Sequence, residues 1–457
     1  MRKIISAMCI MAVLCITSCT RRGGTRTFYA SECGIVLNSD VYKGGGTDQT
    51  AQLQAILDKA PELGRLHLVL DGAALISAPL RVHSNTTIEC PDKSCGVFLA
   101  DGSDCSCLSN TNPDLYEIRT HNITILGGVY NNNSPGQAHH REESDDIRNI
   151  FSTWVYGIDF YGVENLTMKD VTIANQRTFG FNICNWKNVT LENIHIDRRE
   201  RPDAENQDGL HFFGPGQHLV MRNIYGNVGD DFIALAPDEH DKKSSISDVL
   251  IDGVWLDEAD QGIRILCQGE GSIDQVTIRN VHGNYRSFGF TINPWFDSEG
   301  GGHYGNILID NVDLHPMEPN YGYTTPYLFK LGGSIESLTL RNIYLHNPEH
   351  KHQFCIVGSQ YMADGVDEVA CPCKVDRLII DGMYVSEDNP EMYPDSYIKL
   401  VGGEVGLMVL DDVVIRRPGA RQPQGVFVQK AGGRLGEVVT GSLISTPCLK
   451  SLQGSAK

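Results

Sequence analysis

Three aspartates in this chain stand where they could share acid–base work. Asp208 lies in Asn206-Gln-Asp-Gly209, while Asp230 and Asp231 lie in Gly229-Asp-Asp-Phe232. Asp231 follows Asp208 by 23 residues, the length of one repeat in this chain, so the two positions are predicted to stack side by side. Neighbouring carboxylates push their pKa values apart, which lets one act as an acid and another as a base. Such a set is the usual equipment for breaking a glycosidic bond.

The aspartates belong to a repeat that runs through most of the chain. Each copy reads apolar, any, apolar, polar, polar, apolar, and most copies end in Asn-Ile or Asn-Val. Copies are mostly 23 to 31 residues apart, and their apolar residues alternate as they do in a strand. A strand repeated at such a period predicts an all-β solenoid, a parallel β-helix. The copies are Leu166–Val171, Val189–Ile194, Leu219–Ile224, Val249–Val254, Val276–Val281, Ile307–Val312, Leu338–Ile343 and Leu378–Met383, with a degenerate copy at Leu407–Val413.

A second, shorter strand recurs between these copies. In each one, two apolar residues flank a position that must face away from the core, because side chains alternate along a strand. Stacking the coils aligns these positions into one outward column, with Asp208 and Asp231 three residues before two of its members. The predicted column is Asp159, Asn182, His211, Ala234, Arg264, Thr291 and Lys330.

The start of the solenoid carries its own signal. A glycine-rich turn, Gly44–Thr50, leads into Ala51–Leu57, which has helical periodicity. We expect this short helix to cap the open N-terminal end of the β-helix, since a terminal unit must cover the exposed edge. Each coil packs only on its neighbours, so residues 34–457 are predicted to form one domain.

The N-terminus has the features of an export signal. A basic start precedes a short apolar run, Ile4–Ile16, which is too short to cross a membrane as a stable helix. Cys19 follows small residues and resembles a bacterial lipobox cysteine, so we expect a signal peptide at 1–19, lipidation at Cys19 and a tether at 20–33. A plain signal peptide cut nearby is the alternative. The lipid would be the sole membrane contact, and the lack of acidic residues in 20–27 favours the periplasmic side of an outer membrane.

The charge of the chain restricts its partners. A formal net charge of −19 argues against nucleic acid and against anionic lipid surfaces. No cysteine or histidine spacing matches a zinc site, and Cys371-Pro-Cys373 is too tight and has no second pair. We therefore expect no metal ion and no cofactor, and a monomer as the working form.

The cysteine pattern does not decide which disulfides form. Eleven cysteines follow Cys19, an odd number, so at least one stays free or pairs outside the chain. An exported protein can form disulfides. Candidate partners in loop-like segments are Cys90 with Cys95, and Cys105 with Cys107, whereas Cys184 and Cys267 are predicted to be buried thiols.

From about residue 34 to about residue 345, these motifs resemble glycoside hydrolase family 28, the polygalacturonase family. Gly44–Thr50, Asn206–Asp208, Gly229–Asp231 and Gly262–Leu266 are similar to the family's conserved segments. The resemblance implies a right-handed parallel β-helix of the pectin-lyase-like kind and inverting hydrolysis. It implies Asp230 as the general acid, Asp208 and Asp231 as the groups that activate water, and Arg264 as a sugar ligand near the scissile bond.

The chain departs from the family pattern at two points. The family's Gly-His-Gly motif is missing between Asp231 and Arg264, as if one coil were absent. His211 is the better substitute for the histidine of that motif, because it is predicted to face outward beside both acidic sites. The alternative is that His211 is an exposed strand histidine without a role in the site. Leu266 replaces a family lysine that would pair with a uronate carboxylate, which weakens the case for plain polygalacturonate. A rhamnogalacturonan-type glycan fits equally well.

The main functional prediction is an exported glycosidase that acts on pectin-like polysaccharides or oligosaccharides. His211, Asn182, Lys330 and Trp295 are predicted to contact the sugar together with Arg264. We expect Asp257–Asp260 to be a solvated turn. One alternative is a lyase on the same fold, which needs an unpaired basic residue to remove a proton. Another is a β-helix that binds glycans without catalysis.

Overall fold

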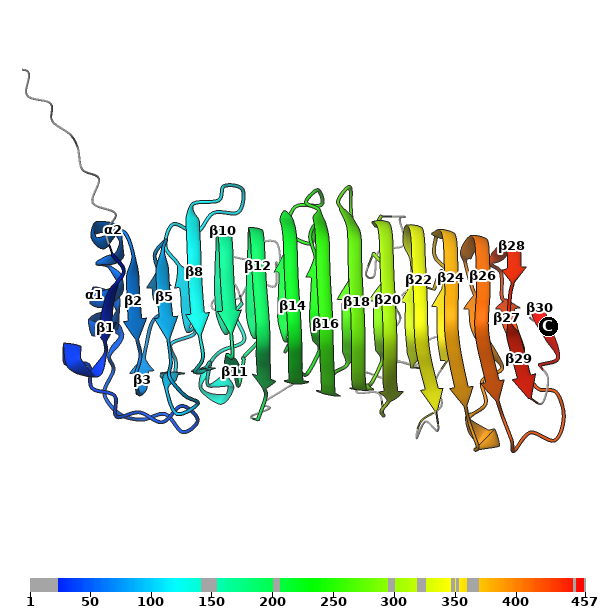
Figure 1. Cartoon of the computed structure of the whole chain (residues 1–457), viewed down its shortest axis with the longest axis horizontal. Helices are drawn as coiled ribbons and strands as arrows, with labels where there is room; N and C mark the ends of the chain where they lie inside the picture. Colours follow the sequence, from blue (N-terminus) through cyan, green and yellow to red (C-terminus); the bar gives the residue numbers. More distant parts are fainter. Residues whose placement is uncertain are drawn as a thin grey trace, which may run out of the picture.

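The structure is a computed structural model that describes residues 24–140, 154–199, 206–294, 301–318, 326–346, 350, 353–359, 370–446 and 449–455. Its strands lie side by side in chain order along the long axis, with two short helices at the N-terminal end (Figure 1). The strands pair in parallel with their counterparts in the coils before and after. The predicted parallel β-helix is confirmed.

Three ladders of strands make up the coils. The long ladder contains β1 (Arg26–Tyr29), β2 (Leu66–Val69), β5 (Thr86–Glu89), β8 (Thr120–Leu126), β10 (Ile158–Lys169), β12 (Phe181–Asp197), β14 (Gly216–Asn227), β16 (Ile246–Glu258), β18 (Ser272–Tyr285), β20 (His303–Pro316), β22 (Gly333–His346), β24 (Cys373–Ser386), β26 (Gly403–Arg416), β28 (Arg434–Thr440) and β29 (Leu443–Thr446). A second, shorter ladder contains β3 (Ala73–Ile76), β6 (Gly96–Leu99), β9 (Val129–Asn131) and β11 (Thr172–Ala174), and it continues into the second half of β12.

The remaining strands form what we call the site ladder, because it carries the predicted column. It contains β4 (Leu80–Val82), β7 (Leu108–Asn110), the first residues of β10 and β12, β13 (Leu210–Phe213), β15 (Asp231–Ala236), β17 (Gln261–Ile265), β19 (Phe288–Ile292), β21 (Tyr327–Leu331), β23 (Gln353–Val357), β25 (Ser396–Leu400), β27 (Val426–Lys430) and β30 (Ser451–Ser455).

The asparagines of the repeat explain how the long strands turn a corner. Asn193, Asn223, Asn280 and Asn311 occupy the second polar position of their copies, and each has φ between 55° and 60°. Asparagine tolerates this left-handed conformation better than most residues. The side chains also bond between coils: the amide of Asn223 donates to the amide oxygen of Asn193 at 2.9 Å. The recurrent Asn-Ile and Asn-Val endings therefore mark bends.

The predicted register is confirmed through the long ladder, with one correction. Leu166 lies beside Val189, and the later copies follow in the same alignment. In the last copy, however, Leu378 lies beside Met408 instead of Leu407. The copy therefore begins one residue later, at Met408, and it then fits the pattern without any degeneracy.

One continuous apolar core runs along the axis of the solenoid, from Ala30 to Val428. The predicted N-terminal helix is confirmed as α1 (Thr50–Leu57), and a short second helix, α2 (Ala60–Leu63), follows it. Leu53, Ile56 and Leu57 of α1 are buried in the core. The helix thus covers apolar surface at the end of the stack, as a capping unit must.

The candidate disulfides are not formed. Cys90, Cys95, Cys105 and Cys107 are all buried, and neither predicted pair is joined by a disulfide. The Cys90 sulfur lies 3.9 Å from the Tyr130 hydroxyl, while the Cys95 thiol donates to Asp92, so these two thiols are directed at different partners. Cys184 and Cys267 are buried thiols, as predicted.

The proposed signal peptide, Cys19 and residues 20–23 of the tether lie outside the described residues, so those predictions stand as made. The rest of the predicted tether is wrong: Arg26–Tyr29 form β1 and pair with β2, Ala30 is buried in the core, and Ser31–Cys33 form a 3-10 helix. Within the described part of the chain, no helix is long and apolar enough to cross a membrane.

Candidate active site

The site ladder places the three aspartates on two neighbouring coils. Leu210 of β13 lies beside Ile233 of β15, which sets Asp208 alongside Asp231. The 23-residue offset therefore does correspond to one coil. One carboxylate oxygen from each of Asp208, Asp230 and Asp231 lies within 4.8 Å of the other two. Asp208 and Asp231 are 3% and 1% exposed, whereas Asp230 is partly accessible to solvent.

Burial raises the pKa of all three carboxyl groups. Burial raises the pKa of Asp230 well above its ordinary value, and the charges of Asp231 and Asp208 raise it further. Burial also raises the pKa of Asp208 to about 6. The pKa of Asp231 is raised by burial too, but the guanidinium of Arg264 opposes that rise. Asp230 is thus both the most accessible of the three and a group held strongly towards its protonated form.

His211 is clamped between two carboxylates. Its Nδ1 lies 2.8 Å from Oδ2 of Asp208, and its Nε2 lies 3.1 Å from Oε2 of Glu239. Burial by itself would lower the pKa of His211, but the hydrogen bonds to these two partners raise it to about 9. The Phe179 ring stacks on the imidazole with centroids 4.1 Å apart and planes 2° from parallel. A positively charged imidazole is therefore held in one orientation beside Asp208.

Arg264 holds the other buried aspartate. Its Nη1 donates to Oδ2 of Asp231 at 2.9 Å. β15 pairs directly with β17, with Ala234 beside Arg264, so no further coil lies between the two sites. The base that a lyase mechanism would require is not supplied by Arg264, since that guanidinium is already engaged with a carboxylate.

The predicted column is confirmed in its order but not in its exposure. The pairings place Asp159, Asn182, His211, Ala234, Arg264, Thr291 and Lys330 in sequence along the site ladder. Most of these residues are nevertheless buried. The alternative of an exposed strand histidine at 211 is therefore wrong.

Two other predicted sugar ligands are occupied with protein partners. The Asn182 amide donates to Oδ1 of Asp159 at 2.9 Å. The Lys330 ammonium lies over the Phe288 ring, 4.8 Å from its centroid. Trp295 lies outside the described residues.

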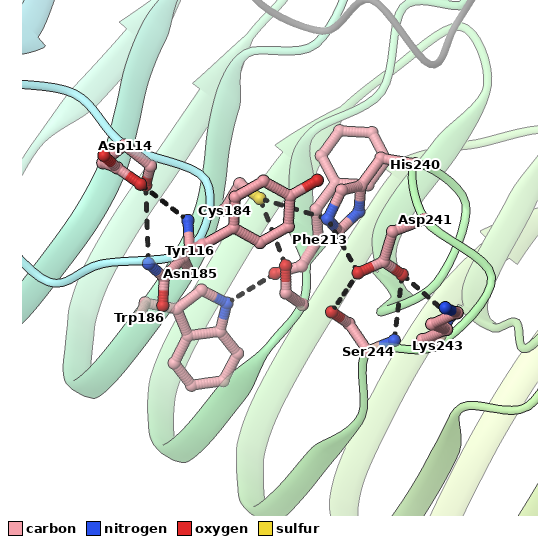
Figure 2. A network of polar contacts seen from close by, with 11 residues as sticks. Asp114, Tyr116, Cys184, Asn185, Trp186, Phe213, His240, Asp241, Lys243 and Ser244 are labelled. Atoms are coloured by element: carbon pink, nitrogen blue, oxygen red, sulfur yellow. Dashed lines mark hydrogen bonds and ion pairs between the residues drawn. The ribbon is translucent and has the colours of Figure 1, made fainter.

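Glu239 is a site residue that the sequence did not reveal. It lies in the turn at 237–243, which reads as an ordinary polar loop, yet its side chain is almost completely buried. Figure 2 shows how the following residues anchor this turn: His240 lies between Cys184 and Asp241. The Asp241 carboxylate in turn accepts hydrogen bonds from Ser244. This anchoring holds Glu239 against His211.

Asp260 corrects another expectation. Asp257 is exposed as predicted, but Asp260 is buried and accepts a hydrogen bond from the Ser287 hydroxyl at 2.7 Å. Burial raises the pKa of Asp260 to about 7. Its backbone amide donates to the Asp230 carbonyl oxygen at 3.1 Å, so this carboxyl group lies on the coil next to Asp230. A fourth carboxyl group therefore adds to the electrostatics of the site.

Two groups of side chains in the described part of the chain have ligand atoms close enough to share a metal ion. One is the aspartate triad itself, and the other is Asp313, His315 and His346 on the outer surface of the solenoid. Neither group was predicted to bind metal.

Comparisons with known proteins agree with this architecture. The family model described as "Glycosyl hydrolases family 28" matches residues 108–316, which include the three aspartates and Arg264. A polygalacturonase from Brassica napus is 26% identical over 164 residues, covering 34% of this chain and 38% of the relative. An exopolygalacturonase from Arabidopsis thaliana is 28% identical over 162 residues, covering 34% of each chain. The matches thus span little more than a third of these relatives.

A solved structure shares the fold over most of the chain. The family 28 exopolygalacturonase from Yersinia enterocolitica aligns with a TM-score of 0.50 at 13% identity, covering 94% of this chain and 78% of that one. The family model, the shared β-helix and the placement of the aspartates on adjacent coils agree with one another. Residues 108–316 of this chain match glycosyl hydrolases family 28, within a fold that the Yersinia enterocolitica enzyme shares.

Proposed function

We propose that this protein hydrolyses glycosidic bonds in pectin-like polysaccharides, of galacturonan or rhamnogalacturonan type. The observation that carries the proposal is the aspartate triad, in which one accessible carboxyl group with a raised pKa adjoins two buried ones. The matched relatives named as polygalacturonases support the substrate class.

In the proposed mechanism, Asp230 donates a proton to the leaving oxygen. A general acid must be protonated at the working pH, and Asp230 combines a strongly raised pKa with access to solvent. Asp208 and Asp231 are buried beside His211 and Arg264, whose positive charges favour the ionised carboxylates. These two aspartates would orient and deprotonate the attacking water.

We propose that His211 positions Asp208 instead of binding the sugar, since both of its ring nitrogens face carboxylates. Arg264 remains the proposed sugar ligand closest to the aspartates, because its side chain is partly exposed while it contacts Asp231.

A groove on the same ladder offers room for a longer glycan. It has a volume of about 450 Å³ and is lined in part by Arg81, Ser109 and Asp159. These residues follow one another in register towards Asn182 and His211, so Arg81 stands four coils from His211. At about 4.8 Å per coil, the groove begins roughly 10 Å from the site and extends to roughly 19 Å. We propose that the sugar chain runs along it.

The stereochemical outcome is a separate part of the proposal. The resemblance implies inversion, yet the closest carboxylate oxygens lie within 4.8 Å, nearer than the roughly 6.5–9.5 Å between carboxyl groups typical of inverting pairs. In this site a third carboxylate changes the geometry, because water can be held by Asp208 and Asp231 together. Proton NMR of the first product formed would show an inverted anomer if the proposal holds and a retained one if it does not.

The substrate class is tested by incubating the mature chain with a panel of pectic polysaccharides and oligosaccharides. New reducing ends without near-ultraviolet absorbance would support hydrolysis. Reducing ends accompanied by that absorbance would indicate a lyase, because elimination leaves an unsaturated sugar. Saturable binding without either product would favour the non-catalytic alternative.

A further inference from the structure

We propose that Asp313, His315 and His346 form a surface site for a divalent transition-metal ion such as Zn²⁺. The three residues lie on two adjacent strands of the long ladder, away from the aspartate triad. β20 pairs with β22 so that Asp313 lies beside Tyr344. His315 and His346 each stand two residues further along, and therefore face each other across neighbouring coils.

The spacing of the ligand atoms suits a single ion. Oδ1 of Asp313 lies 3.4 Å from Nε2 of His315 and 3.6 Å from Nδ1 of His346. Zn²⁺ bound at about 2.0–2.2 Å in a tetrahedral site keeps neighbouring ligand atoms roughly 3.4 Å apart. The two imidazole rings meet nearly edge to face, with centroids 4.9 Å apart at 82°. An ion between the three atoms thus requires only small side-chain adjustments.

The Asp313 carboxylate gives a second, independent indication. Its Oδ1 atom has essentially no solvent-accessible surface and no hydrogen-bond partner in the described structure. The imidazole nitrogens approach this oxygen but do not meet it in hydrogen-bond geometry. A covered carboxylate oxygen without a hydrogen bond costs free energy unless a nearby cation compensates its charge. A bound cation would satisfy this oxygen and both nitrogens at once.

The donor set selects the class of ion. Two imidazoles and one carboxylate suit Zn²⁺ and similar transition-metal ions, whereas Mg²⁺ and Ca²⁺ prefer oxygen ligands alone. The side chains of Asp313, His315 and His346 are 33%, 35% and 46% exposed, so water can complete the coordination shell. The ion would link two consecutive coils through side chains that the strand ladder already holds in place.

The ligands of this site are one repeat apart in the sequence. Asp313-Leu-His315 is followed by His346 after 31 residues, the same spacing that separates the repeat copies beginning at Ile307 and Leu338. Searching for zinc motifs within one local segment misses ligands that a solenoid brings together from successive coils.

The test is equilibrium dialysis of the chelator-treated, untagged mature chain against Zn²⁺, with excess Mg²⁺ as a competitor. His315→Gln and His346→Gln are compared with His218→Gln. The matched control suits this purpose because His218 is exposed and pairs with Asp248 of a neighbouring coil at 2.8 Å, with no second histidine in that pair. Melting temperatures without metal establish that every variant is folded.

We expect one Zn²⁺ per chain in the wild type and in His218→Gln. Each of the two site variants should weaken binding by more than the roughly 10- to 100-fold that loss of an outer-shell partner costs. Zn²⁺ should also raise the melting temperature of the wild type but not that of the site variants. Absence of a saturable site, or a site whose affinity both variants leave unchanged, would overturn the proposal.

Discussion

The imidazole of His211 in β13 lies 2.8 Å from the carboxylate of Asp208, which stands two residues before that strand begins. That contact places a positive charge beside one of the three clustered aspartates, in a region where both partners are buried. It makes His211, which the sequence predicts as a sugar ligand, a positioning residue for Asp208 in the proposed mechanism.

Replacing His211 should impair the proposed base. His211→Gln removes the positive charge that favours ionised Asp208, so the pKa of Asp208 should rise. We expect kcat to fall by about 10²-fold or more, which is the lower range for loss of acid–base assistance. The acidic limb of the pH–rate profile should also move to higher pH. A lower kcat with an unmoved acidic limb would show that His211 acts on the site in another way.

The pH dependence of hydrolysis should follow the coupled carboxyl groups. Activity requires ionised Asp208, whose pKa is about 6, together with protonated Asp230, whose pKa is raised well above its ordinary value. The rate should therefore fall as the pH drops below about 6, and fall again at higher pH as Asp230 loses its proton. Initial rates across a pH series would measure both limbs, which belong to the group as a whole. Full activity at pH 4 would contradict the assignment of Asp208.

Replacing Glu239 should lower kcat although this residue lies outside the aspartate triad. Glu239→Gln retains the size of the side chain but removes the charge that helps to hold His211 protonated. A hydrogen bond to a charged group contributes about 1.5–3 kcal/mol, which corresponds to roughly 10- to 100-fold in rate. We expect a loss of that size in kcat with a smaller change in KM. Glu270→Gln provides a control elsewhere on the surface, and an equal loss in both variants would refute a specific role for Glu239.

The raised pKa of Asp260 predicts that the free energy of unfolding falls as the pH rises. Its pKa is about 7 in the folded chain, whereas an unfolded aspartate titrates near 4, so the folded state binds the extra proton between those values. Ionised Asp260 therefore destabilises the fold, and this cost grows as the pH rises from about 4 to above 7. Asp260→Asn cannot titrate, so its free energy of unfolding relative to the wild type should increase over that range.

Denaturant unfolding at pH 4.5 and pH 8 would measure that difference. Asp257→Asn, at an exposed position on the same segment, should show no comparable pH dependence. A difference for Asp260→Asn that stays constant or reverses between the two pH values would rule out a buried carboxyl group with a raised pKa.

The repeat made much of this architecture predictable. Strand periodicity and a coil-length offset are enough to place Asp208 beside Asp231 and to align His211 with Arg264. The bends at Asn193 and Asn223 follow from residue type, because few other side chains accept a positive φ so readily.

Burial could not be predicted in the same way. Glu239 belongs to a turn that does not carry the repeat motif, and its contact with His211 depends on how that turn folds back over the ladder. Asp260 reads as part of an acidic turn, and its burial depends on Ser287 in the next coil. Such contacts have no period, so a pattern in one sequence does not show them.

The most direct test of the central claim compares Asp230→Asn with Asp257→Asn on whichever pectic substrate the wild type cleaves. We predict that Asp230→Asn retains substrate binding but loses at least about 10²-fold in kcat, because the leaving oxygen no longer receives a proton. Asp257→Asn should match the wild type in both respects. If Asp230→Asn turned over substrate at the wild-type rate, Asp230 could not be the general acid, and the proposed mechanism would be wrong.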